Sequence, residues 1–278
     1  MKHVRPTVYL ASQSPRRQEL LAQLEWCFEL LLPRTLSDLS GLGITQSEVG
    51  FAQANAHERS SKRVKGDDPQ STSLASNVSL NSATFAAQAN EQAQQNQDHK
   101  ATLSKALEDL ERAHSGEGAL AYVKRVTHLK FELAKNLARA MGRGYDPSRP
   151  LMCADTTVVL DRTILGKPQN PSEAREMLLA LSARTHRVYT CVVVGNLSHQ
   201  AHRVSRSWVR FAPLSESQVD EYLHTQEWMG KAGGYAVQGR AAAFIEQIRG
   251  SYSGIMGLPL FETAQLLEDF VQRGLNVT

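Results

Sequence analysis

The alternation of apolar and polar positions predicts a strand, a helix and a second strand at the start of the chain. Residues 7–10 form a β-branched and aromatic run, residues 15–24 show helical spacing, and residues 28–32 are apolar except for Glu29. A long helix is predicted from residue 119 to the glycines at 142 and 144, because apolar side chains recur there at Tyr122, Val126, Leu129, Leu133 and Leu137.

The second half of the chain shows short elements of both kinds. We expect strands over residues 151–154, 157–160, 163–165, 188–195 and 204–211, and helices over residues 171–181, 215–223 and 259–271. The first of these strands runs into Asp155, and the last two are long enough to pair as antiparallel neighbours. This order favours a mixed α/β fold with a largely antiparallel sheet over a regular βαβ repeat.

Residues 46–118 differ in composition from the rest of the chain. Between residues 71 and 102, Ser, Thr, Ala, Asn and Gln supply 24 of the 32 residues. So little apolar area does not offset the entropy of ordering the segment. We therefore expect a single domain over residues 1–278, interrupted by a disordered or loosely helical insertion at about 46–118. A short docked helix is expected at 102–113, where apolar residues share one helical face.

Charge and cysteine content narrow the class of protein. The formal net charge is +3, from 31 Lys and Arg against 28 Asp and Glu, which argues against a protein that coats nucleic acid or a membrane surface. Three widely separated cysteines argue against a disulfide framework or a zinc ribbon. No apolar stretch is long enough for a signal peptide or a membrane span. We expect a soluble cytoplasmic protein that binds neither nucleic acid nor a membrane.

Two junctions carry polar groups that suit chemistry on an anion. At the first, Ser14 and Pro15 form a helix cap, and the same place offers an anion free N–H groups beside Ser12, Arg16 and Arg17. At the second, Asp155 follows an apolar strand. This carboxylate is either a turn cap or, at the end of a sheet and facing a cleft, a general base or metal ligand.

Two loops hold further candidates. Lys167 lies in the turn Gly166-Lys167-Pro168, where it is either a solvated surface lysine or a functional one. The loop 230–239 is rich in glycine, which allows the backbone to approach a ligand closely. Its Gln238 offers both a donor and an acceptor, as reading the edge of a base requires. A flexible loop without a function fits the same pattern. Residues 250–254 favour a turn and a helix cap.

Five of these motifs together resemble one family. They are LASQSPRRQELL at 10–21, ADT at 154–156 with GKP at 166–168, HRVYT at 186–190, the loop 230–239, and IRGSYSGIMGLPL at 248–260. Over residues 7–44 and 119–273 the chain resembles the Maf family of nucleoside triphosphate pyrophosphatases. The resemblance implies a Maf/Ham1-like (ITPase-like) α/β fold, with a mixed, largely antiparallel sheet flanked by helices and a central cleft.

The resemblance also implies a role for each site residue. Asp155 stands where the family has its proton acceptor, and base preference falls to Arg16, Thr156 and Gln238. Further substrate contacts fall to Ser12, Ser14, Arg17, Lys130 and Lys167. The family's acidic pair after the second strand has no direct counterpart here, and Asp38 is the nearest acidic residue that could serve instead.

The implied reaction is hydrolysis of dTTP and UTP to the monophosphate and pyrophosphate, with modified pyrimidine nucleotides as further substrates. Thr156 and the loop KAGGYAVQG are similar to the subgroup with this preference. The resemblance implies Mg²⁺ or Mn²⁺ as the cofactor and a homodimer as the assembly. Two alternatives stay open: a pyrophosphatase of 7-methyl-GTP or inosine type, and a non-enzymatic regulator of septum formation that uses the insertion to bind a partner.

Overall fold

The computed structural model describes residues 5–33 and 111–274. Most of the insertion expected at 46–118 lies outside the described residues, as do most of the helix expected at 102–113 and the whole of Asp38. Their expected arrangement therefore stays a prediction.

A seven-stranded sheet forms the centre of the described part. Its strands follow the order β2-β1-β3-β5-β6-β7, and β4 pairs with β3 outside this order. β1 runs parallel to β2 and β3, whereas the other pairs are antiparallel. The strands are β1 (Val8–Leu10), β2 (Phe28–Leu30), β3 (Leu151–Leu160), β4 (Thr163–Leu165), β5 (Thr185–Gly195), β6 (Gln200–Phe211) and β7 (Ile245–Arg249). The expected mixed, largely antiparallel sheet is confirmed.

The expected helices are also confirmed within a few residues at each end, and a short helix at Tyr252–Met256 lies where a turn and a helix cap were expected. The α-helices are α1 (Pro15–Gln23), α4 (Ala119–Ala140), α5 (Pro171–Leu181), α6 (Glu216–His224), α7 (Tyr252–Met256) and α8 (Leu260–Gly274). Short 3₁₀ turns are η2 (Gly142–Gly144), η3 (Ala232–Gly234) and η4 (Arg240–Phe244). Among the described residues, no helix combines the length and the apolar character that crossing a bilayer requires.

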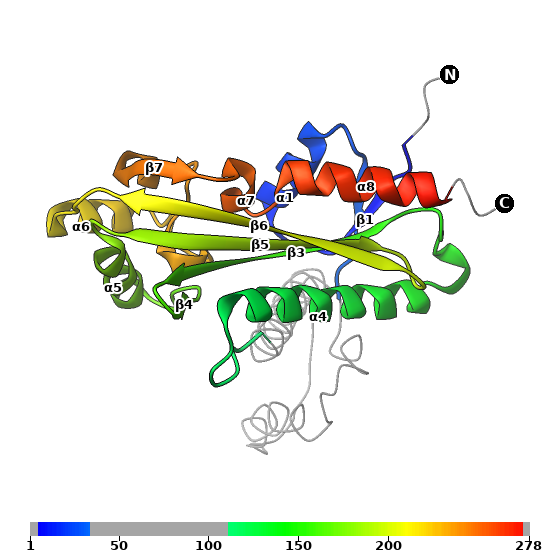
Figure 1. Ribbon diagram of the computed structural model, residues 1–278, viewed down its shortest axis with the longest axis horizontal. Coiled ribbons are helices and arrows are strands. Elements are labelled where there is room, and N and C mark those ends of the chain that lie inside the picture. The colour runs from blue at the N-terminus through cyan, green and yellow to red at the C-terminus, as the bar shows by residue number, and fades with distance from the viewer. Residues whose placement is uncertain (1–4, 34–110, 275–278) are drawn as a thin grey trace, which may run out of the picture. The chain divides into compact units, whose positions relative to one another are not determined.

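Helices cover both faces of the long strands. Figure 1 shows α4 along one face and α8 along the other. Successive strand residues point to opposite faces, so β5 serves both layers. Cys191 and Val193 pack with Phe131 of α4, whereas Val192 and Val194 pack with a cluster that includes Leu266 and Leu267 of α8.

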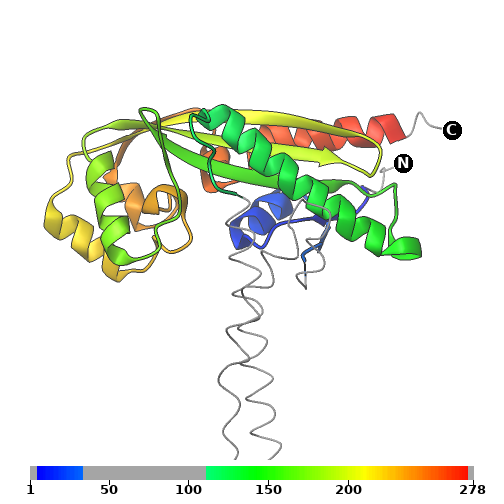
Figure 2. The ribbon, with the colours of Figure 1, turned by 90° about the horizontal axis from the view of Figure 1, so that it is seen from below.

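A further helical group packs at the end of the sheet near β4. Leu178 of α5 and Val219 of α6 belong to one buried cluster with Val188 and Val209 of the sheet. Figure 2 shows these two helices gathered at that end, away from most of α4. Val188 has the same strand parity as Val192, so α5 and α6 cover the same face as α8. α7 lies over the strand residues between the two helical groups, and the hydroxyl of the buried Thr190 donates to the carbonyl of its Gly254.

Two elements differ from the expectation. β3 continues through Asp155 to Leu160 as one strand, whereas a strand ending at residue 154 was expected. The strand tolerates a carboxylate because a lysine pairs with it. β7 was not expected, because only two of its five residues are apolar and both are half-buried. It is held by its pairing with β6.

Candidate functional site

The edge of the sheet is open at Asp155 and Thr156. β1 pairs with β3 at Leu151 and Met152, and β4 pairs with β3 only from Val158 onward. Between these points, β5 is the only described strand that pairs with β3. Because neighbouring strand residues point to opposite faces, the side chains of Asp155 and Thr156 flank this open edge from its two sides. The carboxylate therefore lies at a gap within the sheet edge, and the expectation that it lies at the end of the sheet is wrong.

Asp155 is paired with a lysine from α4. Lys130 Nζ lies 2.7 Å from Oδ1 of Asp155, and the aspartate is 8% exposed. A buried carboxylate is costly unless a charged partner or donors compensate for the lost hydration. The pair explains why an apolar strand tolerates a carboxylate in its middle, and it fixes the direction in which the carboxylate points.

Arg17 contacts three segments on the side of the strand edge opposite to Asp155. Its Nε donates to the carbonyl of Gly257 at 2.8 Å, one terminal nitrogen donates to Ser12 Oγ at 3.2 Å, and the other lies 3.5 Å from Thr156 Oγ1. Gly257 has a φ of +123°, a conformation that favours glycine. The start of α1, the end of α7 and the middle of β3 are thus held together by one guanidinium.

A buried hydroxyl continues this network and fixes its direction. Thr190 Oγ1 donates to the carbonyl of Gly254 at 2.7 Å, so its single proton is used. The 3.0 Å contact between Thr156 Oγ1 and Thr190 Oγ1 therefore has Thr156 as its donor. The order of donation is Arg17 to Thr156 to Thr190 to Gly254. Thr156 consequently presents only a lone pair to a ligand.

The start of α1 keeps its anion-binding groups. Ser14 takes the N-cap position and Pro15 the first helical position, as expected. The Ser14 side chain makes no capping hydrogen bond, while its backbone N–H donates to Ser12 Oγ at 3.2 Å. Ser14 therefore takes the predicted capping position but does not form the capping hydrogen bond. The first turn of α1 retains backbone N–H groups that are able to bind an anion.

Cations gather beside this helix start. Burial lowers the pKa of Arg16, and Arg17 lowers it further, whereas Tyr222 and Glu19 act in the opposite direction. Burial also lowers the pKa of Lys231, and the charge of Arg16 lowers it further. Cations that are partly buried and close enough to repel one another gain stability when an anion binds among them. Lys231, which the sequence did not single out, belongs to this group.

Backbone contacts join the two motif loops. The N–H of Gly233 donates to the carbonyl of Gly166 at 2.9 Å, so the glycine-rich loop lies against the turn that carries Lys167. His186 Nε2 lies 2.8 Å from the hydroxyl of Tyr235, which ties the loop to β5. Burial lowers the pKa of His186 to about 4, so this histidine is a neutral structural residue at pH 7.

Lys167 and Gln238 are exposed, and no hydrogen bond within the described residues joins either side chain to the rest of the site. The loop around Gln238 is nevertheless fixed. Glu227 accepts a hydrogen bond from the backbone N–H of Arg240 at 2.8 Å, and a Cβ at Gly239 would collide with its carboxylate. Both predicted ligands thus lie on ordered turns with their side chains directed to solvent.

Besides Lys231, three contributors were not predicted: Thr190, Glu227 and Gly257. Thr190 lies in the motif at 186–190, and a hydroxyl within an otherwise apolar strand was its only signal. Glu227 lies before the glycine-rich loop with no motif of its own. Gly257 lies within the motif at 248–260, but the turn and helix cap were predicted only for residues 250–254.

The described residues contain no cluster of three or more His, Cys, Asp or Glu side chains that could hold a metal ion. This part of the chain therefore has no metal site built entirely from protein side chains. Mg²⁺, however, is often bound by one or two carboxylates together with substrate phosphates. Asp155 suits that second arrangement.

The fold and the site define an α/β protein that combines an anion-binding helix start with a carboxylate at an open strand edge. The chain belongs to the Maf family, since residues 7–270 match the family described as Maf-like protein. It is 41% identical over 266 residues to a dTTP/UTP pyrophosphatase of Burkholderia lata, covering 94% of this chain and 92% of that protein. A dTTP/UTP pyrophosphatase of Aromatoleum aromaticum is 38% identical over 270 residues, covering 97% and 98%. Another, from a Polaromonas species, is 52% identical over 160 residues, covering 58% and 78%.

Proposed function

We propose that this protein hydrolyses dTTP and UTP to the nucleoside monophosphate and pyrophosphate. The observation that carries the proposal is the Lys130–Asp155 pair at the open edge of β3, directly beside the Arg17–Thr156 contact. The carboxylate and Lys130 lie on one side of this edge, and Arg17 and the anion-binding helix start lie on its other side. The names of the relatives from Burkholderia lata and Aromatoleum aromaticum support the choice of substrate.

The cations supply the binding energy for the triphosphate. Arg16, Arg17 and Lys231 lie around the start of α1, and Lys130 lies at the carboxylate. Lys167, on its exposed turn, adds a further positive charge. A nucleoside triphosphate carries several negative charges that repel an attacking oxygen nucleophile, so these side chains lower the barrier by neutralising them.

Asp155 acts on the attacking water. Its carboxylate accepts a proton as the water oxygen forms a bond to the α phosphorus, and the bond from that phosphorus to the bridging oxygen breaks. The electron pair leaves with pyrophosphate. Lys130 holds the carboxylate in one orientation from 2.7 Å. Proton acceptance by a positioned carboxylate is worth ~10²–10⁴-fold in rate.

The direction of the hydroxyl network fits a base with a ring N–H donor. Uracil and thymine share this donor with guanine and hypoxanthine, so the choice of a pyrimidine rests on the names of the relatives. Thr156 donates its proton to Thr190, so it accepts from a ligand and does not donate. Uracil and thymine carry an N3–H donor that such a lone pair accepts, and Gln238 supplies both a donor and an acceptor. A site built on hydrogen bonds rejects a base that leaves these groups unpaired more strongly than an apolar pocket does.

A divalent cation fits this arrangement through Asp155 and the substrate phosphates. When bound, Mg²⁺ or Mn²⁺ would neutralise phosphate charge and polarise the phosphoryl oxygens. Family membership further leads us to propose a homodimer in the cytoplasm, which sedimentation of the purified protein and cell fractionation test.

A panel of triphosphates tests the proposed function, with pyrophosphate release as the readout. We expect dTTP and UTP to be cleaved faster than GTP, ITP and 7-methyl-GTP. Preference for a purine triphosphate would move the protein to one of the other base specificities. Binding of triphosphates without any turnover would favour the non-enzymatic regulator.

A further inference from the structure

The sheet face that carries Asp155 continues beyond α4 as an exposed surface whose residues the proposed reaction does not use. Arg187 on β5, Arg206 and Arg210 on β6 and Arg249 on β7 lie on it together with Trp208, and we call this set the arginine face. Pairing fixes their common side, because Arg187 is opposite Trp208 and Trp208 is opposite Arg249. Residues directly opposite one another in a sheet share a face.

This face is the continuation of the surface that α4 covers. Cys191 and Val193 of β5 pack under α4, and Arg187 lies on the same side of the strand by alternation. Trp208 is 39% exposed and Arg206, Arg210 and Arg249 are exposed. An apolar core on the opposite side, with Val209 and Phe211 fully buried, holds these strands in place.

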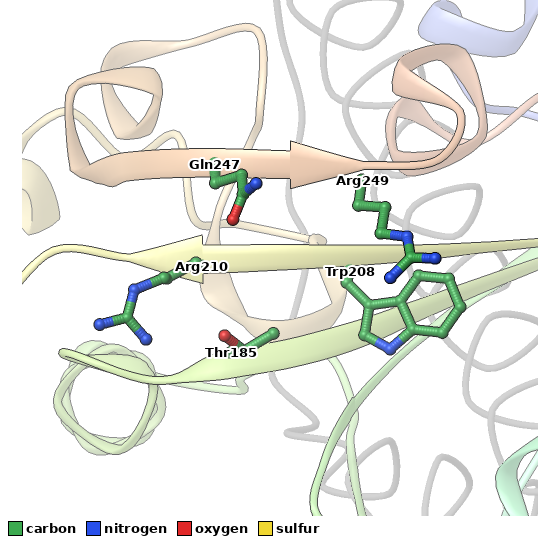
Figure 3. Close-up of a pocket in the computed structure, with 5 residues that line it drawn as sticks. All are labelled: Thr185, Trp208, Arg210, Gln247 and Arg249. Atoms are coloured by element: carbon green, nitrogen blue, oxygen red, sulfur yellow. The ribbon is translucent and has the colours of Figure 1, made fainter.

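A shallow pocket lies on the arginine face. It is lined by Thr185, Trp208, Arg210, Gln247 and Arg249. Figure 3 shows the side chain of Gln247 directed toward the neighbouring strand β6 and the Arg249 guanidinium above the indole ring of Trp208. That guanidinium carbon is 5.5 Å from the ring centroid. The pocket therefore combines an aromatic surface, a hydroxyl, an amide and two guanidinium groups.

The pairing of cations with aromatic rings recurs along the face. The Arg206 guanidinium lies 5.9 Å from the ring centroid of Tyr189, two residues along the strand from the pair at Trp208. Glu246 pairs with Arg210 at 2.7 Å, and Asp161 pairs with Arg184 at the rim. These two carboxylates leave the face with a clear excess of positive charge.

We propose that the arginine face binds single-stranded nucleic acid. Single strands are bound by positive charge that follows the backbone and by aromatic rings or guanidinium planes on which bases stack. The face offers both, spread across three strands, and this extent exceeds a single nucleotide. The net charge of +3 led to the expectation of no nucleic-acid partner, but that sum does not describe how charge is distributed, and here it is concentrated.

Charge also argues against a second copy of the chain as the occupant. A two-fold symmetric contact would set the same patch against itself and bring arginines together. Like charges that face each other across an interface repel and weaken the contact. The acidic backbone of a single strand instead complements the face.

Fluorescence anisotropy tests the proposal with the full-length protein and a labelled oligouridylate of about 12 nucleotides. We expect a Kd below about 100 µM at about 100 mM salt. The double variant Arg206→Gln/Arg249→Gln should raise this Kd by about tenfold or more and lower the salt slope by about 1.4, because two phosphate contacts are lost. Trp208→Ala should weaken binding, and Trp208→Phe should restore much of it.

The matched control is Arg139→Gln/Arg143→Gln, which removes the same charge from exposed positions at the C-terminal end of α4 and in the turn η2 that follows it. We expect its Kd for the oligonucleotide to stay within about twofold of the parent value. Equal weakening in both double variants would overturn the proposal, since it would show only a long-range charge effect. It would also be overturned if Arg16→Gln, and not the face variant, abolished binding, because the strand would then occupy the site at α1. A shift in oligomeric state caused by the face variant would show a protein interface instead.

Discussion

Lys130 on α4 and Asp155 on β3 form an ion pair at 2.7 Å beside the open edge of the sheet. The helix and the strand are each held by buried side chains, so the carboxylate has little freedom to turn. We predict that Asp155→Asn lowers kcat for dTTP by ~10²–10⁴-fold, because the amide does not accept the proton of the attacking water. Pyrophosphate release at saturating substrate measures this loss.

As a control, the Asp155→Asn variant must be shown to fold. Circular dichroism and the thermal transition should show a folded protein, since Asn is close to Asp in shape. A folded Asp155→Asn protein that hydrolysed dTTP at the unchanged rate would remove the assignment of Asp155 as the proton acceptor.

The hydroxyl of Thr190 orders the site without touching the substrate. Thr190→Val keeps the side chain's shape but removes the acceptor for Thr156 and the donor to Gly254. We predict a fall of about tenfold in kcat/KM for dTTP, because Thr156 is then free to turn its proton toward the ligand. Thr190→Ser should retain most of the activity. If Val and Ser gave equal values, the order of donation proposed for this network would be wrong.

His186 should make the protein less stable as the pH falls. Its pKa in the folded protein is about 4, against 6.5 for the ordinary side chain, because burial disfavours the charged form. The unfolded chain therefore binds more protons between pH 6.5 and 4, and the free energy of unfolding falls over this range by about 3 kcal/mol. Urea titrations at several pH values measure this fall. His186→Gln should flatten the dependence, and an unchanged pH slope in that variant would contradict the role of burial.

Gly233 joins the glycine-rich loop to the turn of Lys167. Its φ is +72°, and an added Cβ would lie 2.9 Å from Val158 Cγ1. We predict that Gly233→Ala lowers the free energy of unfolding by about 1–3 kcal/mol. Gly166→Ala is the matched control, since a Cβ there meets nothing within 4 Å. Its effect should stay within about 0.5 kcal/mol. Equal losses in the two variants, measured by urea unfolding, would refute the steric account.

Local sequence patterns predicted most of the described fold, whereas contacts between distant segments were not visible to them. α1 and α4 were predicted because each has an apolar face at helical spacing. β3 was expected to stop at residue 154, because a carboxylate in a buried strand is costly. The strand continues because Lys130, 25 residues earlier, compensates that cost.

In the candidate site, too, the sequence predicted individual residues but not the contacts between distant segments. Ser12, Arg17 and Thr156 were each predicted, and the structure brings them together through one guanidinium. Thr190 was missed because its acceptor, Gly254, lies 64 residues further along the chain. A hydroxyl in a strand acquires its role only from such a partner, and its position in the sequence does not reveal it.

Product analysis of a triphosphate panel with and without Mg²⁺ or Mn²⁺ tests most directly whether the protein hydrolyses dTTP and UTP. We predict that these two give the nucleoside monophosphate and pyrophosphate, that purine triphosphates react more slowly, and that a chelator stops the reaction. Release of orthophosphate with formation of the diphosphate, or a preference for a purine triphosphate, would contradict the proposed function.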